Sequence, residues 1–203
     1  CTVASPTLAF SATKFFNDHD IPWEWVRSES VHEAEGFTLT NAYERTGQLG
    51  PDRWYAAIGA LSLFRGTPLL VVHAGTATTV DSLFQTGDGE YRFMGGRIAP
   101  GPALMHKALL SAVPTLDSGL TEHKDFPLCS SDAITTGIID AQVGLITQAY
   151  ESMCEAGQRP KIILAGGSSR FLAPRLRTLH PTLIVRHNLV LGGLAQKARE
   201  SKR

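Results

Sequence analysis

The pair Gly75-Thr76 joins two apolar, β-branched stretches of the chain and has the residue types needed to bind a phosphate group. Backbone N–H groups at a glycine turn can approach phosphate oxygens closely because no Cβ intervenes. The Thr76 hydroxyl can donate to the same group, and Asp81 could reach a metal ion through a bound water. The segment therefore predicts a strand, a phosphate-binding turn and a second strand. The alternative is a tight hairpin in which threonine merely suits a strand.

A second candidate group is Asp52 in the segment Gly50-Pro51-Asp52-Arg53. Proline suits the first position of a helix, so Asp52 is expected in its first turn. A carboxylate there either complements the helix dipole or acts as a general base toward an attacking hydroxyl. Arg53 offers a planar fork for a carboxylate or phosphate, or forms a surface ion pair. The residues alone leave these alternatives open.

Two further glycine pairs follow along the chain, Gly95-Gly96 and Gly166-Gly167. The first lets a ligand or another backbone approach, or marks a bulge in a strand. The second lies between an apolar stretch and a helical one, which suits nucleotide binding at the carboxyl edge of a strand, although a plain strand-to-helix turn has the same pattern. Glycine turns at 50, 75 and 95, in this order, favour a kinase site.

The elements that would position these residues are of mixed type, which predicts an α/β fold. Helices are expected at 11–19, from Pro51 to about 65, and at 102–112, 132–156, 171–179 and 189–199. Strands are expected at 23–26, 69–72, 78–84, 91–99, 161–165 and 183–185, with a hairpin turn at 86–89. Residues 33–50 are polar and rich in glycine, so they are predicted to form a loop. Residues 1–4 are typical of the middle of a sheet.

Composition excludes several classes of protein. The 203 residues carry 19 basic and 19 acidic side chains, so there is no broad basic surface to hold a nucleic acid. The three cysteines have no paired spacing, which fits a reducing compartment better than a disulfide framework. The longest apolar stretches are too short to span a bilayer. We therefore expect a cytoplasmic protein that binds neither nucleic acid nor membrane.

Taken together, the motifs resemble those of type III pantothenate kinases, also named the Bvg accessory factor family. The resemblance covers nearly the whole chain. It rests on Asn41-Ala42-Tyr43, Gly50-Pro51-Asp52-Arg53, Gly75-Thr76-Ala77-Thr78-Thr79-Val80-Asp81, Gly95-Gly96 with Pro100-Gly101, Gly137, Ala165-Gly166-Gly167, and 188–194. Each motif is modest alone, and the set is specific.

The resemblance implies a duplicated α/β fold of the ASKHA type (actin-like, ribonuclease-H-like). Residues 1–66 would be the remainder of the first ribonuclease-H-like lobe, and residues 67–203 would be the second lobe. It also implies ATP-dependent phosphorylation of pantothenate, the first step of coenzyme A synthesis, with Mg²⁺. Family members are homodimers whose pantothenate pocket lies at the subunit interface.

The resemblance also assigns roles to single residues. Asp52 corresponds to the catalytic base, and Gly50, Pro51, Asp52 and Arg53 correspond to a pantothenate-binding segment. Tyr43 and Ser130, the latter usually threonine in the family, correspond to further substrate contacts. Thr76 corresponds to an ATP contact.

The chain departs from the family pattern in two places. The opening strand of family members carries an Asp-x-Gly-Asn-Thr-like phosphate loop that this sequence does not contain, so we expect an N-terminally truncated form of the fold. His73 stands where many members have an aspartate that binds K⁺ or NH₄⁺, and an imidazole is a poor ligand for a hard cation. These departures motivate an alternative, a catalytically impaired regulatory accessory protein of the same fold. A sugar or acetate kinase of the superfamily is disfavoured by the placement of Gly50-Pro51-Asp52-Arg53.

Overall fold

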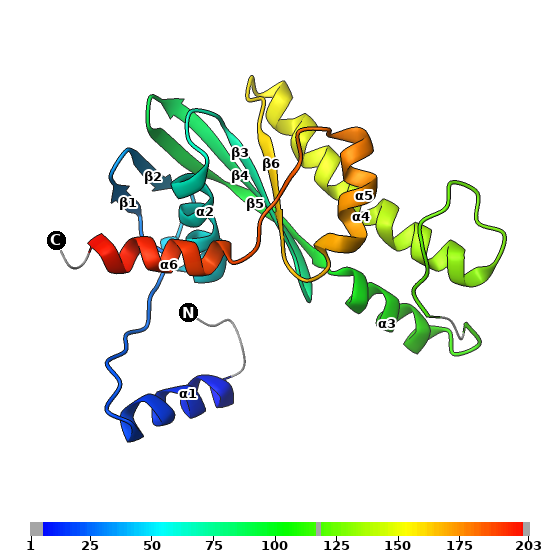
Figure 1. Ribbon diagram of the computed structural model, residues 1–203, viewed down its shortest axis with the longest axis horizontal. Coiled ribbons are helices and arrows are strands. Elements are labelled where there is room, and N and C mark those ends of the chain that lie inside the picture. Colours follow the sequence, from blue (N-terminus) through cyan, green and yellow to red (C-terminus); the bar gives the residue numbers. More distant parts are fainter. Residues whose placement is uncertain (1–5, 117–118, 201–203) are drawn as a thin grey trace.

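A mixed seven-stranded sheet forms the centre of the computed structural model, which describes residues 6–116 and 119–200 (Figure 1). Its order is β1-β2-β5-β4-β3-β6-β7. The strands are β1 Val31–Ala34, β2 Phe37–Asn41, β3 Leu69–Ala74, β4 Ala77–Gly87, β5 Glu90–Pro100, β6 Lys161–Ala165 and β7 Ile184–Val185. Strands β3, β4 and β5 are antiparallel neighbours, whereas β2 pairs with β5, β6 with β3 and β7 with β6 in parallel.

Helices cover both faces of this sheet. The helical elements of the described chain are α1 Pro6–Asp18, the 3-10 turn η1 Thr46–Gln48, α2 Pro51–Leu63, α3 Pro102–Ala112, α4 Ser130–Glu155, α5 Ser169–Leu179 and α6 Leu189–Glu200. Helices α2 and α6 lie on one face, and α4 and α5 lie on the other (Figure 1). Helix α1 stands apart from the sheet (Figure 1). None of the described helices has the length and apolarity that a membrane span requires.

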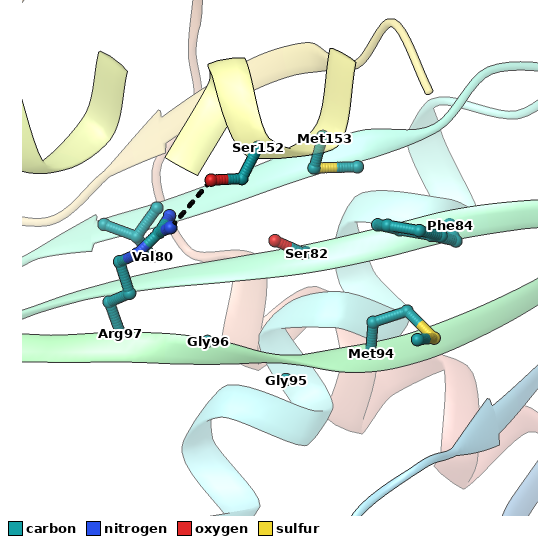
Figure 2. Close-up of a pocket in the computed structure, with 9 residues that line it drawn as sticks. All are labelled: Val80, Ser82, Phe84, Met94, Gly95, Gly96, Arg97, Ser152 and Met153. Atoms are coloured by element: carbon teal, nitrogen blue, oxygen red, sulfur yellow. Dashed lines mark hydrogen bonds between the residues drawn. The ribbon is translucent and has the colours of Figure 1, made fainter. Parts of the chain in front are cut away.

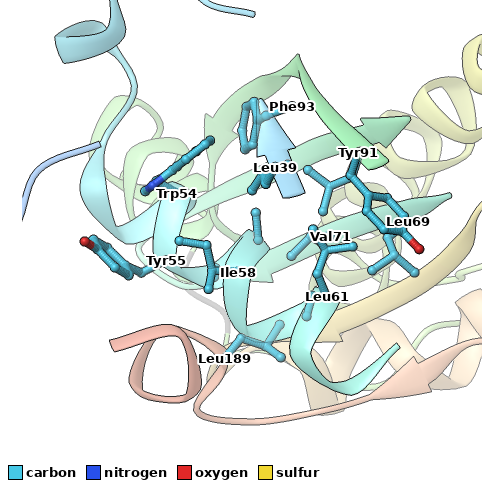
Figure 3. Close-up of a cluster of buried hydrophobic side chains, with 14 of the residues drawn as sticks. Leu39, Trp54, Tyr55, Ile58, Leu61, Leu69, Val71, Tyr91, Phe93 and Leu189 are labelled. Carbon is cyan, nitrogen blue, oxygen red and sulfur yellow. The ribbon is translucent and has the colours of Figure 1, made fainter. Parts of the chain in front are cut away.

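Strand β3 is buried on both sides because successive side chains point to opposite faces. Leu69 and Val71 join the core beneath α2, together with Trp54, Ile58 and Phe93 (Figure 3). The intervening residues Leu70, Val72 and Ala74 join a second core against α4 and α5. This packing explains why β3 is a continuous apolar stretch.

Helices α2 and α6 cross with their backbones in close contact. A Cβ added at Gly59 would collide with the carbonyl oxygen of Leu189, and one added at Gly193 would collide with that of Tyr55. Glycine is therefore required at both positions of the crossing. Because the crossing fixes α2 against the sheet, it also fixes the first turn of α2, where Asp52 and Arg53 lie.

Two sequence-based predictions of local structure are wrong. Residues 33–50 contain the second half of β1, all of β2 and η1, because Phe37 and Leu39 are buried against the α2 core and Gly36 turns the chain at φ +84°. Residues 23–26 form no strand; Trp23 and Trp25 instead contact each other edge to face, and the Trp23 indole donates to Asn17. The segment predicted at residues 1–4 lies outside the described residues.

The remaining elements agree with the predictions, and the expected α/β class is confirmed. Helix α3 and strand β6 have the predicted bounds, and β4 and β5 form the predicted hairpin with its turn at Asp88-Gly89. The mixed sheet with helices on both faces fits the ASKHA-type fold. Division of the chain into lobes at 1–66 and 67–203 stays a prediction. The single sheet takes β1 and β2 from residues 1–66 and its other strands from residues 67–203.

Candidate functional site

Arg53 forms a buried ion pair with Asp81 at the start of α2. Its Nε and Nη2 both donate to Asp81 Oδ1, at 2.9 and 2.5 Å, and its Nη1 donates to the Tyr43 hydroxyl at 2.9 Å. Arg53 is 7% exposed and Asp81 1% exposed. The structure thus brings together Tyr43 and Arg53, two of the predicted substrate contacts. It also places Asp81, expected to reach a metal through water, against an arginine.

The electrostatics of the pair follow from its burial. Burial raises the pKa of Asp81, the hydrogen bonds and charge of Arg53 lower it, and the nearby charge of Asp52 raises it; the net result is a pKa of about 6. Burial acts to lower the pKa of Arg53, but the hydrogen bonds that Arg53 donates to Asp81 and Tyr43, together with the charge of Asp81, outweigh it, so this pKa is raised. Arg53 therefore remains protonated, and Asp81 is the member of the pair that titrates.

Gly96 is the residue that leaves room for this ion pair. It lies opposite Asp81 in the β4–β5 ladder, where the register shifts between Ser82 and Leu83. A Cβ at Gly96 would collide with Asp81 Oδ1, and it would stand 2.5 Å from Arg53 Nη2. The predicted alternatives for Gly95-Gly96, a bulge and a close approach of other groups, therefore both apply.

Asp52 occupies the first turn of α2, as predicted, and is half-buried. Its Oδ1 lies 2.6 Å from the point where a Cβ at Gly50 would stand, so the carboxylate folds back over Gly50. The helix begins at Pro51 without a side-chain cap, and the carboxylate complements the open N–H groups of that turn. A side chain at Gly50 would displace the carboxylate of Asp52 from this position.

A cavity of about 270 Å³ opens beside Gly96 on the sheet face that α4 covers, opposite to the face that α2 covers (Figure 2). Ser82, Met94 and Arg97 line it, together with Ser152 and Met153 of α4. Arg97 donates to the Ser152 hydroxyl across it, at 3.0 Å. The sheet separates this cavity from Asp52, so it does not extend the site around the ion pair.

A second group of predicted residues meets at the carboxyl ends of the parallel strands β3 and β6. The Gly75 N–H donates to the carbonyl of Ala77, and the Gly101 N–H donates to the carbonyl of Thr76. Thr76 itself is exposed. Gly166 has φ +94°, and a Cβ there would collide with Ala74. The Gly166 turn therefore packs against Ala74 at the end of β3, next to the Gly75-Thr76 turn.

His73 is exposed beside this edge, although the rest of β3 is buried. It lines a cavity of about 270 Å³ with Gly166, Gly167 and residues 187–191. In the β3–β4 ladder His73 is opposite Thr79, and Val71 is opposite Asp81. His73 and Asp81 therefore lie on the same face, offset by two positions or about 7 Å along the strands.

Strands β3 and β4 connect the group around Asp81 with the group around the Thr76 turn. The ion pair of Arg53 and Asp81 lies under the start of α2, and the Thr76 turn lies at the end of the same two strands. From Asp81 to Ala77, the first residue of β4, the strand rises about 13 Å. Thr79 and the exposed Ile98 lie between the two groups on this face.

Ser130 is not brought to this face. It is the first residue of α4, and Ser152, whose hydroxyl reaches Arg97, lies near the other end of the same helix. At about 1.5 Å per residue the two serines are roughly 33 Å apart. Within one chain, Ser130 therefore lies far from the side chain of Arg53.

The amino-acid sequence of the chain matches that of a known protein family. A family model described as type III pantothenate kinase matches residues 1–152. The type III pantothenate kinase of Acidovorax ebreus is 34% identical over 203 residues, which cover 98% of this chain and 74% of that protein. The protein of the same name from Dechloromonas aromatica is 37% identical over 183 residues, 88% of this chain and 71% of that protein.

A solved structure shares the fold. The Baf family transcriptional activator from Campylobacter jejuni superposes with a TM-score of 0.57 and 24% sequence identity, over 79% of this chain and 67% of that chain. At 24% identity, this likeness shows a common fold only.

Proposed function

The chain belongs to the type III pantothenate kinase family, and we propose that it transfers the γ-phosphoryl group of ATP to the primary hydroxyl of pantothenate, the first step of coenzyme A synthesis. The observation that carries this proposal is that Asp52 and Tyr43 lie beside the buried ion pair of Arg53 with Asp81, a residue of β4, which begins directly after the Thr76 turn. A cytoplasmic location, expected from the cysteine content, forms part of the proposal.

Asp52 is the proposed general base. Its carboxylate lies at the surface end of α2, half-buried, and can accept the proton of the attacking hydroxyl. Phosphoryl transfer needs little beyond positioning and charge neutralisation, so one well-held carboxylate is sufficient on the acceptor side.

Arg53 and Tyr43 are the proposed contacts to the pantothenate carboxylate. Three of the five guanidinium N–H groups of Arg53 are used by Asp81 and Tyr43. The two that remain, one on each Nη, can donate to a carboxylate. Asp81 then serves to orient the guanidinium, because both of its hydrogen bonds come from Arg53.

Thr76 and the adjoining glycine turns are the proposed nucleotide contacts. Thr76 is exposed, so its hydroxyl can donate to a phosphate group, and the open space beside Gly167 leaves room for one. Among the described residues no group of three or more His, Cys, Asp or Glu side chains could hold a metal ion. Mg²⁺ would therefore be held chiefly by the phosphates and water, as it commonly is. His73 presents an imidazole, which does not suit K⁺ or NH₄⁺.

A second copy of the chain would complete the substrate site in this proposal. Ser130 lies at the far end of α4 from the strands that carry Asp81 and Gly96. If Ser130 contacts pantothenate, a partner subunit has to supply it. The proposed active species is therefore a homodimer, which sedimentation analysis with and without pantothenate would detect.

The test is pantothenate-dependent release of ADP by the protein and by Asp52→Asn. We expect kcat to fall at least about 100-fold, with the KM for ATP little changed. Asp18→Asn, at the exposed end of α1, is the matched control. An unaffected Asp52→Asn enzyme would refute the assigned base. If calorimetry with ATP and Mg²⁺ detects no binding and no turnover occurs, the regulatory accessory protein is the better description.

A further inference from the structure

A buried histidine lies between two carboxylates where the C-terminal end of α6 meets β1 (Figure 1). His32, the second residue of β1, is 2% exposed although β1 is an edge strand of the sheet. Its Nδ1 lies 3.5 Å from Glu29 Oε2, and its Nε2 lies 3.5 Å from Glu200 Oε2. None of these three residues belongs to the groups around Asp81 or Thr76.

Side chains of α6 hold both carboxylates in place. The Lys197 ammonium donates to Glu29 Oε1 at 2.5 Å. The Gln196 amide donates to Glu200 Oε1 at 2.7 Å. Each carboxylate therefore has one oxygen engaged by a neighbour on α6, and its other oxygen is the one that faces His32.

The protonation state of the His32 ring decides whether it can bond to both carboxylates. Its Nε2 is buried and has no hydrogen-bond partner among the described residues. A neutral imidazole carries a proton on one nitrogen, so in either tautomer the other nitrogen presents a lone pair to a carboxylate oxygen. The protonated ring donates from both nitrogens. A movement of roughly 0.7 Å by each oxygen would then form two charge-assisted hydrogen bonds of about 2.8 Å.

The surroundings make this ring the group that titrates near neutral pH. The charged or titratable groups that neighbouring elements bring to it are Glu33 of β1, Lys197 of α6, Tyr55 of α2, and Arg65, which lies 5.7 Å from the centre of the adjacent Phe37 ring. Burial, and then the nearby glutamate charges, raise the pKa of Tyr55 to about 12, so its phenol stays neutral. A histidine ordinarily loses its proton at about pH 6.5 and a glutamic acid at about pH 4.3, so histidine changes charge between them and neutrality.

We propose that His32, Glu29 and Glu200 form a pH-dependent clasp that ties the last turn of α6 to the edge of the sheet. When the ring is protonated, it donates to both carboxylates and the clasp is closed. When the ring loses its proton, one nitrogen repels the carboxylate that faces it, and the pair of Lys197 with Glu29 remains. The clasp is therefore closed under mildly acidic conditions and opens as the pH rises through neutrality. It does not depend on the kinase activity proposed above.

Hydrogen exchange of the amides of residues 196–200, followed by NMR on the full chain at about pH 5.5 and about pH 8, tests the clasp. After correction for intrinsic exchange rates, we expect about tenfold more protection at the lower pH, since a hydrogen bond to a charged group contributes at least that factor. Both ring nitrogens of His32 should show the protonated ¹⁵N shift there. His32→Gln should abolish the difference in protection, whereas His19→Gln, at an exposed histidine that follows α1, should keep it.

A second variant tests the clasp without a change in the core. Glu200→Gln keeps the size of the side chain and an acceptor oxygen but removes the charge. Because charge-assisted hydrogen bonds are about twice as strong as neutral ones, the tenfold difference should fall to about threefold. Glu155→Gln, at the exposed end of α4, is the matched control and should leave the difference unchanged.

Three results would overturn the proposal: equal protection at both pH values, greater protection at the higher pH, or a neutral His32 ring at the lower pH. A full tenfold difference in His32→Gln would also overturn it, because no other group is assigned to the effect. If His32→Gln does not fold, Glu200→Gln decides the question, and an unchanged difference in that variant refutes the clasp.

Discussion

Replacement of Asp81 by asparagine tests the electrostatics of the buried pair with Arg53. Asparagine keeps the shape of the side chain and an oxygen that accepts from Arg53, but it does not titrate. Burial raises the pKa of Asp81 to about 6 in the folded protein, from 3.8 as the ordinary value. Between these values the folded state holds a proton that the unfolded state releases, so stability falls as the pH rises.

The size of this effect follows from the difference of roughly two pKa units, which corresponds to about 3 kcal/mol. The free energy of unfolding of the unsubstituted protein, minus that of Asp81→Asn, should therefore fall by about 3 kcal/mol between pH 3 and pH 7. Most of the fall is expected before pH 6. Groups such as Asp132 and His180, whose pKa values are lowered, titrate alike in both proteins and cancel in the difference.

The assay is urea unfolding at several pH values, monitored by far-ultraviolet circular dichroism. Asp88→Asn is the matched control, because Asp88 is exposed at the Asp-Gly hairpin turn, where asparagine is equally suited. Its difference curve should be flat. A flat curve for Asp81→Asn, or one that rises with pH, would refute the reasoning that burial outweighs the effect of Arg53 on this carboxyl.

Three further substitutions test the packing and the nucleotide contact. Gly96→Ala should lower the free energy of unfolding by about 1–3 kcal/mol and reduce turnover, because the added Cβ collides with the ion pair of Arg53 and Asp81. Its control in the same urea titration is Gly137→Ala, which should be neutral or slightly stabilising because a Cβ at that position of α4 meets open space. Gly59→Ala should lower the urea midpoint, since the close crossing of α2 and α6 has no room for a methyl group, and an unchanged midpoint would contradict that packing. Thr76→Ala should raise the KM for ATP about tenfold in the ADP-release assay, and Thr86→Ala, an exposed threonine farther along β4, should not.

Local elements were predictable where the signal lies within a short stretch of chain. Strand β3 is apolar on both faces, α3 begins at a Gly-Pro pair, and the β4–β5 hairpin has a glycine-rich turn. Strand β2 was missed because it is short and its parallel partner, β5, lies some fifty residues later. Its stability comes from the burial of Phe37 and Leu39, and the alternation of apolar and polar residues in Phe37-Thr38-Leu39-Thr40 is the local signal that could have found it.

The same division holds for the candidate site. The residue types of Gly50-Pro51-Asp52-Arg53 and Gly75-Thr76, each set by a local turn, were enough to predict a helix start and a turn between strands. The partner of Arg53 was not predictable, because Asp81 is 28 positions away and meets it only when α2 packs on the sheet. Only the tertiary structure decided that Gly96 must lack a side chain and that Ser130 lies far from Arg53, because both depend on distances across the sheet and along α4 rather than on neighbours in the chain.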